Sequence, residues 1–295
     1  MIKFIRRICF CSFVVLFISC ATFVRSSDAD INSFTPQWQQ LCGGVEFAGA
    51  KITKPAMEFY ALKIDLTDSS IEIVVNDPDP KNLSGIIPSI KVSSFAKKYD
   101  CIAAVNAGPF YPSSAKEGEL RKISGLFISN GQLVSPPSGY DALVFYKDGR
   151  TAIVHDKDAS VSDIKDALGG FYMLLKDGIY TPAPFADIKR HPRSAAGLSA
   201  DSTTLYILVI DGRRLESAGA LLYETAEIMQ KLGANSALNF DGGGSSVLAL
   251  AVKTFSGKIS PKIVNIPVHG FYGSERAVAS CLGVRKKSDI APLIP

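Results

Sequence analysis

The stretch Asn239-Phe240-Asp241-Gly242-Gly243-Gly244-Ser245-Ser246 is the most informative segment of this sequence. Apolar residues precede it at 237–238 and follow it at 247–250, which predicts a polar corner between two buried strands. Three consecutive glycines lose much conformational entropy on ordering, so a fold retains them where the backbone needs positive φ or where another group approaches closely. Consecutive amides in such a turn can form an anion-binding nest. The alternative is a wide hairpin loop whose polar residues are solvated.

The corner offers hydrogen-bonding groups of several kinds. The candidates to donate hydrogen bonds to an anion are the backbone amides of Gly242, Gly243 and Gly244. Its polar side-chain groups are the amide of Asn239, the carboxylate of Asp241 and the hydroxyls of Ser245 and Ser246. We therefore expect a ligand-binding site here.

The remaining pattern predicts an α+β fold, a single domain of mixed or antiparallel β-sheets with few helices. Residues 58–66 and 71–75 alternate in polarity as a strand pair, and Asn130-Gly131 predicts a tight hairpin within residues 124–134. Apolar residues at helical spacing over residues 219–232, followed by Gly233, predict one long amphipathic helix. Hairpins outnumber helices, which argues against a βαβ repeat.

Residues 1–25 have the pattern of a secretory signal. Lys3, Arg6 and Arg7 precede an uncharged apolar run from Ile8 to Val24. Three alternatives stay open: a cleaved signal peptide, a lipoprotein signal with a lipid on Cys20, and an uncleaved anchor of about 17 apolar residues, the short limit for a bilayer. All three predict an exported protein, periplasmic or extracellular, with membrane contact only through the anchor or lipid. We expect a linker over residues 26–44, the functional domain over 45–285 and a C-terminal tail over 286–295.

Three cysteines lie beyond this signal, at Cys42, Cys101 and Cys281. An exported setting permits one disulfide, and a Cys42–Cys281 bond would join the ends of the domain, but spacing does not fix the pairing. Cys101 begins an apolar run and is expected to be a small buried hydrophobe. No CxxC motif is present, so a structural zinc site is not expected.

Polar residues also gather at the predicted ends of other strands, where binding residues tend to lie. Three arginines there are candidates to hold a phosphate, namely Arg193, Arg213 and Arg276. The candidate acids, bases or nucleophiles are Asp211, Glu224 and Asp241. Each candidate has a structural alternative. Asp211 also fits a simple turn, and Glu224 fits the solvated face of its helix. Arg276 fits an ion pair with Glu275 or with a buried carboxylate.

Several functional classes are disfavoured. The net charge of +4 is too small to indicate a nucleic-acid partner, and basic and aromatic residues do not interleave. The glycine corner lacks the lysine of a P-loop, and no GxSxG or HExxH motif occurs. We expect no organic cofactor, while a calcium ion held by oxygen ligands near Asp241 stays open.

Seven segments, in this order, resemble the phosphodiester glycosidase domain family. They are VNAGPF (105–110), SGLFISNGQLV (124–134), HPRSAAG (191–197), LYILVIDGR (205–213), SAGALLYETAEIMQKLGA (217–234), LNFDGGGSS (238–246) and ERAVASCLGV (275–284). The order and spacing from Arg193 to Ser246 are the most specific part. Phe240 and Ser194 stand where the family most often has Leu and Thr, and Pro109 replaces a more usual apolar residue.

The resemblance implies hydrolysis of a sugar 1-phosphodiester, because the animal member of this family removes N-acetylglucosamine from a mannose 6-phosphate diester. It implies a small-molecule or glycan phosphodiester as substrate, in the cell envelope or outside the cell. On this hypothesis the corner amides, Ser245 and one or more arginines bind the phosphate. Asp241 acts as nucleophile or base, and Asn106 and Asn239 hold sugar hydroxyls. The alternative is a non-catalytic envelope module that binds glycans or phosphodiesters.

Overall fold

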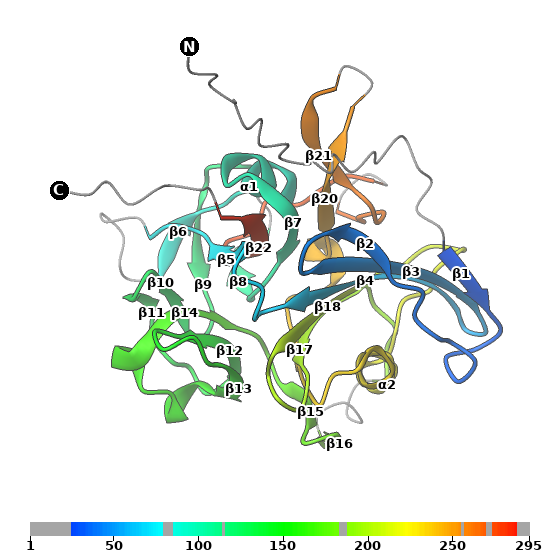
Figure 1. Cartoon of the computed structure of the whole chain (residues 1–295), viewed down its shortest axis with the longest axis horizontal. Helices are drawn as coiled ribbons and strands as arrows, with labels where there is room; N and C mark the ends of the chain where they lie inside the picture. Colours follow the sequence, from blue (N-terminus) through cyan, green and yellow to red (C-terminus); the bar gives the residue numbers. More distant parts are fainter. Residues whose placement is uncertain are drawn as a thin grey trace, which may run out of the picture.

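Strands dominate the computed structural model, which describes residues 25–78, 85–113, 116–182, 188–254, 257–269 and 273–287 (Figure 1). In these ranges there are two α-helices, α1 Val92–Lys98 and α2 Leu222–Leu232. No helix there is both long and apolar enough to cross a membrane. The predicted signal, with Cys20, and nearly all of the predicted tail lie outside the described residues. The fold is mostly antiparallel β with few helices.

The largest sheet has nine strands, in the order β1-β3-β4-β18-β17-β19-β15-β16 with β2 paired to β3. All of its pairs are antiparallel except that of β1 with β3. The bounds are β1 Arg25–Asp28, β2 Gln39–Cys42, β3 Val45–Thr53, β4 Ala56–Asp65, β15 Met173–Lys176, β16 Ile179–Tyr180, β17 Arg193–Leu198, β18 Thr204–Ile210 and β19 Ser236–Asn239.

Three smaller sheets complete the fold. One five-stranded sheet has the order β21 Ile259–Ile263, β20 Leu248–Lys253, β7 Cys101–Asn106, β22 Cys281–Lys286 and β5 Ile71–Val75. The other has the order β11 Gln132–Ser135, β10 Phe127–Ser129, β14 Ile164–Gly169, β12 Asp141–Tyr146 and β13 Thr151–His155. A three-stranded sheet joins β6 Ile86–Pro88, β9 Leu120–Ile123 and β8 Phe110–Tyr111. The predicted Asn130-Gly131 hairpin is confirmed, with φ of 50° and 77° at its two turn residues.

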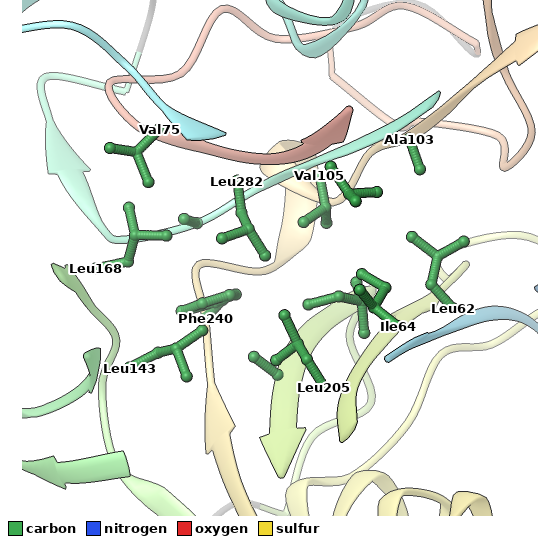
Figure 2. Close-up of a cluster of buried hydrophobic side chains, with 14 of the residues drawn as sticks. Leu62, Ile64, Val75, Ala103, Val105, Leu143, Leu168, Leu205, Phe240 and Leu282 are labelled. Carbon is green, nitrogen blue, oxygen red and sulfur yellow. The ribbon is translucent and has the colours of Figure 1, made fainter. Parts of the chain in front are cut away.

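Apolar residues on both faces of the large sheet create two core clusters. On β4, Tyr60, Leu62 and Ile64 join one cluster, while the alternate residues join the other. Figure 2 shows the first cluster, in which three sheets contribute side chains, among them Leu62, Ile64, Leu205, Val105, Leu282, Leu143 and Leu168. Phe240 of the glycine corner is fully buried in this cluster. Burying a phenylalanine contributes about 2–3 kcal/mol, so the core anchors the corner.

Helix α2 covers the opposite face of the large sheet through Leu222, Ile228, Met229 and Leu232. It has 11 residues and begins at Leu222, so the long helix predicted from residue 219 is not formed. Gly219 has a φ of 95°, and Ala220 pairs with His191 in an isolated β-bridge, so both are unavailable to the first turn. The helix ends as predicted, with Gly233 in the left-handed conformation at φ of 112°.

The interval 26–44, expected to be a linker, contains β2 and most of β1 and is part of the large sheet. Ile31 and Phe34 are buried in the second cluster, which fixes this interval to the domain.

The three cysteines that the structure describes, Cys42, Cys101 and Cys281, are buried and free, so the suggested bond between Cys42 and Cys281 is absent. These two residues lie in different core clusters. Cys101 is a small buried side chain, as expected, and burial raises the pKa of its thiol to about 12.

Candidate active site at the glycine corner

The glycine corner joins two different sheets. β19 of the nine-stranded sheet ends at Asn239, and β20 of a five-stranded sheet begins at Leu248. A single 3-10 turn, η4 Gly243–Ser245, lies between them, and Gly243 has a positive φ of 61°. The corner is therefore a crossover between sheets and not a hairpin loop, and its shape depends on how the two sheets pack.

Asn106, at the end of β7, ties the two ends of the corner together. Its Nδ2 donates to the Asp241 carbonyl at 2.6 Å, and its Oδ1 accepts from Ser194 Oγ at 2.8 Å and the Val247 amide at 3.2 Å. The residue is 1% exposed. The structure thus places Asn106 as a support of the corner, whereas the sequence suggested contact with a sugar.

A second asparagine, Asn265, supports the downstream end of the corner and carries no sequence signal that we recognised. Its Nδ2 donates to the Ser246 carbonyl at 3.0 Å and to Asp211 Oδ1 at 3.1 Å. Its Oδ1 accepts from the Leu248 amide at 2.8 Å. The corner is therefore held by a buried asparagine at each end.

Asp211, predicted as a catalytic candidate, is buried beneath this support. Its carboxylate accepts from Asn265, from the Ile266 amide at 3.0 Å and from Arg214 Nη1 at 2.9 Å. Burial raises the pKa of Asp211 to about 6, although these hydrogen bonds and the charge of Arg214 oppose the shift. Its visible contacts make it a structural anchor for Asn265.

Glu224, another predicted catalytic candidate, is also engaged by the protein. Its two oxygens accept from Arg190 Nη1 and Nη2 at 2.5 and 2.6 Å, and Oε2 accepts from the Leu221 amide at 2.9 Å. The glutamate therefore satisfies the first turn of α2 and pairs with an arginine at the same time.

Arg193, predicted to bind phosphate, is 8% exposed. Its Nε donates to the Ala220 carbonyl at 3.0 Å, and its Nη2 donates to the Lys189 carbonyl at 3.1 Å. These bonds tie together the chain segments on either side of the His191–Ala220 bridge, a structural function.

Arg213 and Arg276, in contrast, reach the glycine turn. A Cβ added at Gly243 would lie 3.2 Å from Arg213 Nη2, and one added at Gly244 would lie 2.7 Å from Arg276 Nη2. Arg213 itself has a φ of 59°, an uncommon left-handed backbone for a non-glycine residue. Two guanidinium groups thus approach the turn where glycine leaves room for them.

Within the described ranges, no carboxylate pairs with either of these arginines within 4.0 Å. The neighbouring Glu275 instead accepts from the amide and hydroxyl of Ser93 at 2.8 and 2.6 Å, at the first turn of α1. The predicted alternative of an Arg276–Glu275 ion pair is therefore not formed. The charge of both guanidinium groups remains available to an anion.

Asp241 places a carboxylate on the same turn. The Ser245 side chain and the Gly242 amide both favour the charged form of this carboxylate, and Ser245 Oγ accepts from Arg276 Nη1 at 3.2 Å. Burial raises the pKa of Asp241 to about 6, against the opposing effects of Ser245 and of the Arg276 charge. Of the three predicted catalytic carboxylates, Asp241 is the one at the turn approached by both arginines.

Two further corner groups are buried without a hydrogen-bond partner in the part of the chain that the structure describes: Asn239 Oδ1 and Ser246 Oγ. Leaving a buried polar atom unsatisfied costs about 1–3 kcal/mol. Such atoms are therefore suited to accept or donate a hydrogen bond when a ligand binds. The same described ranges contain no group of three or more His, Cys, Asp or Glu side chains that could hold a metal ion.

Comparison with known proteins matches residues 99–285 to the model of the phosphodiester glycosidase family. The chain is 31% identical over 260 residues to the SPbeta prophage-derived uncharacterized protein YomE of Bacillus subtilis (strain 168), covering 83% of this chain and 37% of YomE. It thus spans little more than a third of the length of that relative.

Solved structures share the fold. The catalytic domain of zebrafish N-acetylglucosamine-1-phosphodiester alpha-N-acetylglucosaminidase, auto-inhibited by its pro-peptide, aligns with a TM-score of 0.59 at 20% identity, over 86% of this chain and 89% of that one. A hypothetical protein from Synechocystis aligns with a TM-score of 0.60 at 15% identity, over 87% of this chain and 64% of that one. These low identities carry the fold alone, but the family model covers more than half of the sequence. The chain belongs to the phosphodiester glycosidase family.

Proposed function

We propose that this protein hydrolyses a sugar 1-phosphodiester at the glycine corner, cleaving the bond between the anomeric carbon and the phosphate oxygen. One observation carries the proposal. A carboxyl group with a raised pKa, Asp241, shares a turn with two guanidinium groups, neither of which forms an ion pair within 4.0 Å with a described carboxylate. Membership of the phosphodiester glycosidase family supports the same reaction class.

The change in phosphate charge during this reaction explains the two arginines. A phosphodiester carries one negative charge, whereas the phosphomonoester released by C–O cleavage has a second ionisation near pH 6. Negative charge on the phosphate therefore grows as the bond breaks. Arg213, Arg276 and the turn amides would bind the transition state more tightly than the substrate, which is the requirement for catalysis.

The charge on the departing phosphate also accounts for the use of one carboxylate. Phosphate leaves as an anion and needs no proton from a general acid, unlike an ordinary sugar alcohol. Asp241 would act either as a base, taking a proton from the water that attacks the anomeric carbon, or as the nucleophile itself. The first route inverts the anomeric configuration and the second retains it, so the product anomer distinguishes them.

The proposed setting is the cell envelope or the extracellular space. The basic and then apolar pattern of residues 1–25 supports export, with or without a lipid on Cys20. A glycan or small molecule that carries a sugar 1-phosphodiester is the substrate class that fits this location. In the sugar part of the site, Asn239 Oδ1 would accept a hydroxyl or amide hydrogen from the substrate.

The test is turnover of a panel of sugar 1-phosphodiesters in oxygen-18 water, with Asp241→Asn beside the wild type. We expect label in the sugar, and a loss of at least about 1,000-fold in the variant, because the charge that activates or replaces water is gone. Asp148→Asn, at an exposed carboxylate paired with Arg150, is the matched control and should retain full activity.

Two outcomes contradict the proposal. Label in the phosphate would show P–O cleavage, and full activity in a folded Asp241→Asn protein would remove this residue from catalysis. If the folded wild type binds phosphate but turns over no substrate of the panel, the binding-module alternative becomes the better account.

A further inference from the structure

Each of the three guanidinium nitrogens of Arg276 has a defined contact or position at the corner. Nη1 donates to Ser245 Oγ at 3.2 Å, and Nη2 lies over Gly244. Nε, on the remaining edge, donates to His269 Nδ1 at 3.1 Å. Since a guanidinium group is planar, fixing Nε and Nη1 also fixes the direction in which Nη2 points.

Arg276 is half-buried, and the acceptor on its Nε is an imidazole rather than a carboxylate, the partner with which arginine forms its strong charge-assisted hydrogen bonds. A carboxylate would hold the group in place but would also neutralise it. A neutral imidazole holds it in place and leaves the positive charge for a ligand. The local carboxylate that might have competed, Glu275, is bound to Ser93.

The hydrogen bond requires neutral His269 with its proton on Nε2, because Nδ1 must accept. Burial, together with the positive charge of Arg276, lowers the pKa of His269 and so favours the neutral form. Arg213 repeats the arrangement on the other side of the turn, with Nη2 3.3 Å from His191 Nδ1. Both arginines at the corner are thus in contact with an imidazole.

We propose that His269 is a positioning residue, which orients Arg276 over Gly244 while leaving the guanidinium charge available to the substrate phosphate. This inference rests on the proposed function, because it assumes that Arg276 binds the phosphate. His269 acts only through Arg276, so its effect should vanish when the arginine is absent.

Three substitutions separate the acceptor from the bulk of the ring. His269→Asn keeps an acceptor at the δ position, His269→Gln moves it one bond further out, and His269→Leu removes it. The first readout is affinity of the purified full chain for inorganic phosphate by calorimetry, which needs no knowledge of the substrate. We expect about a tenfold loss in His269→Leu and His269→Gln and less than about a threefold loss in His269→Asn.

The second readout is a double-mutant cycle with Arg276→Ala. Adding His269→Leu to that background should weaken phosphate binding no further, since contacting residues that act as a unit are not additive. His155→Leu, at an imidazole outside the corner, is the matched control and should bind phosphate like the wild type. If His269→Leu fails to fold, the comparison of the Asn and Gln variants decides the question.

The outcomes separate this inference from the function it rests on. Phosphate binding by the wild type with equal affinity in all His269 variants would overturn the positioning role and leave the proposed function standing. Losses that multiply in the double variant would overturn it as well. No phosphate binding by the wild type would overturn both, since the corner would then not be the anion site.

Discussion

Replacing Gly244 with alanine tests the anion site with a single methyl group and no change of charge. The added Cβ would lie 2.7 Å from Arg276 Nη2 and 3.0 Å from its Cζ. Ordinary van der Waals contact begins at 3.4 Å, so the guanidinium must retreat by about 0.7 Å. Gly244 does not have a left-handed φ, so the alanine introduces no backbone strain of that kind.

The expected effect is large on activity and small on stability. The end of an arginine side chain moves easily, so the free energy of unfolding should change by less than about 1 kcal/mol. The bond from Nη1 to Ser245 and the position over the turn would both be disturbed. A displacement approaching 1 Å in a charged group that binds the transition state costs roughly 10- to 100-fold in kcat/KM.

Two measurements follow, phosphate affinity by calorimetry and kcat/KM on whichever sugar 1-phosphodiester is turned over. Gly43→Ala is the control, because its added Cβ would meet the side chain of Asp68 at 3.3 Å, a milder crowding of one flexible side chain outside the corner. It should leave both quantities unchanged. If folded Gly244→Ala protein keeps wild-type phosphate affinity and activity, then Arg276 does not bind the phosphate at the glycine turn, and the proposed anion site is wrong.

Three other expectations concern single carboxylates and their partners. Burial raises the pKa of Asp241 to about 6, and this group must lose its proton to act as base or nucleophile. We therefore expect kcat/KM to rise about tenfold per pH unit up to about pH 6 and then to level off. A fall of kcat/KM through this range would instead make Asp241 an acid. Arg214→Met removes the guanidinium group that pairs with the buried Asp211, so the free energy of unfolding, measured by urea denaturation, should fall by about 3–5 kcal/mol. The control Arg150→Ala, which breaks an exposed ion pair, should lower it by less than about 1 kcal/mol. Glu224→Gln should lower the melting temperature but leave kcat per folded molecule unchanged, and a kcat loss in folded protein would restore its catalytic candidacy.

The sequence predicted the corner and the general fold because both leave local signals. Alternating polarity and the Asn130-Gly131 turn are properties of neighbouring residues, and they indicated a β-rich domain. Three glycines beside Asp241 between two apolar runs similarly mark a site within one short segment. Arg213 and Arg276 were among the candidates because each follows or precedes a predicted strand.

Which candidate residues support the corner and which lie at the turn depends on long-range contacts that the sequence does not show. Asp211 and Asp241 are both aspartates at strand ends, and burial raises the pKa of each to about 6. They differ in their partners, since Asn265 lies 54 residues from Asp211 in the chain and meets it only after folding. His269 similarly stands alone in the sequence, and only its contact with Arg276 indicates a function.

Two predictions from local composition were wrong for physical reasons: the linker over residues 26–44 and the start of the helix at residue 219. Strand β2 begins with two glutamines, but its pairing with β3 uses backbone hydrogen bonds, which are indifferent to side-chain polarity. The helical spacing over residues 219–232 is real. However, Ala220 pairs with His191 in a β-bridge and Gly219 has a φ of 95°, so tertiary pairing prevents the helix from starting there.

The position of the corner between two sheets links the geometry of the proposed active site to the core. Asp241 follows Phe240, which is fully buried where the three sheets meet, and its own amide donates to the Ala107 carbonyl at 2.9 Å. Asn106, from the five-stranded sheet, accepts a hydrogen bond from Ser194 of the nine-stranded sheet. A shift between the sheets would therefore move the Asp241 carboxylate relative to Arg213, which is carried by the turn after β18. The polar atoms that we propose bind and react lie beside a triple glycine, but the large shared core makes their spacing a property of the whole domain.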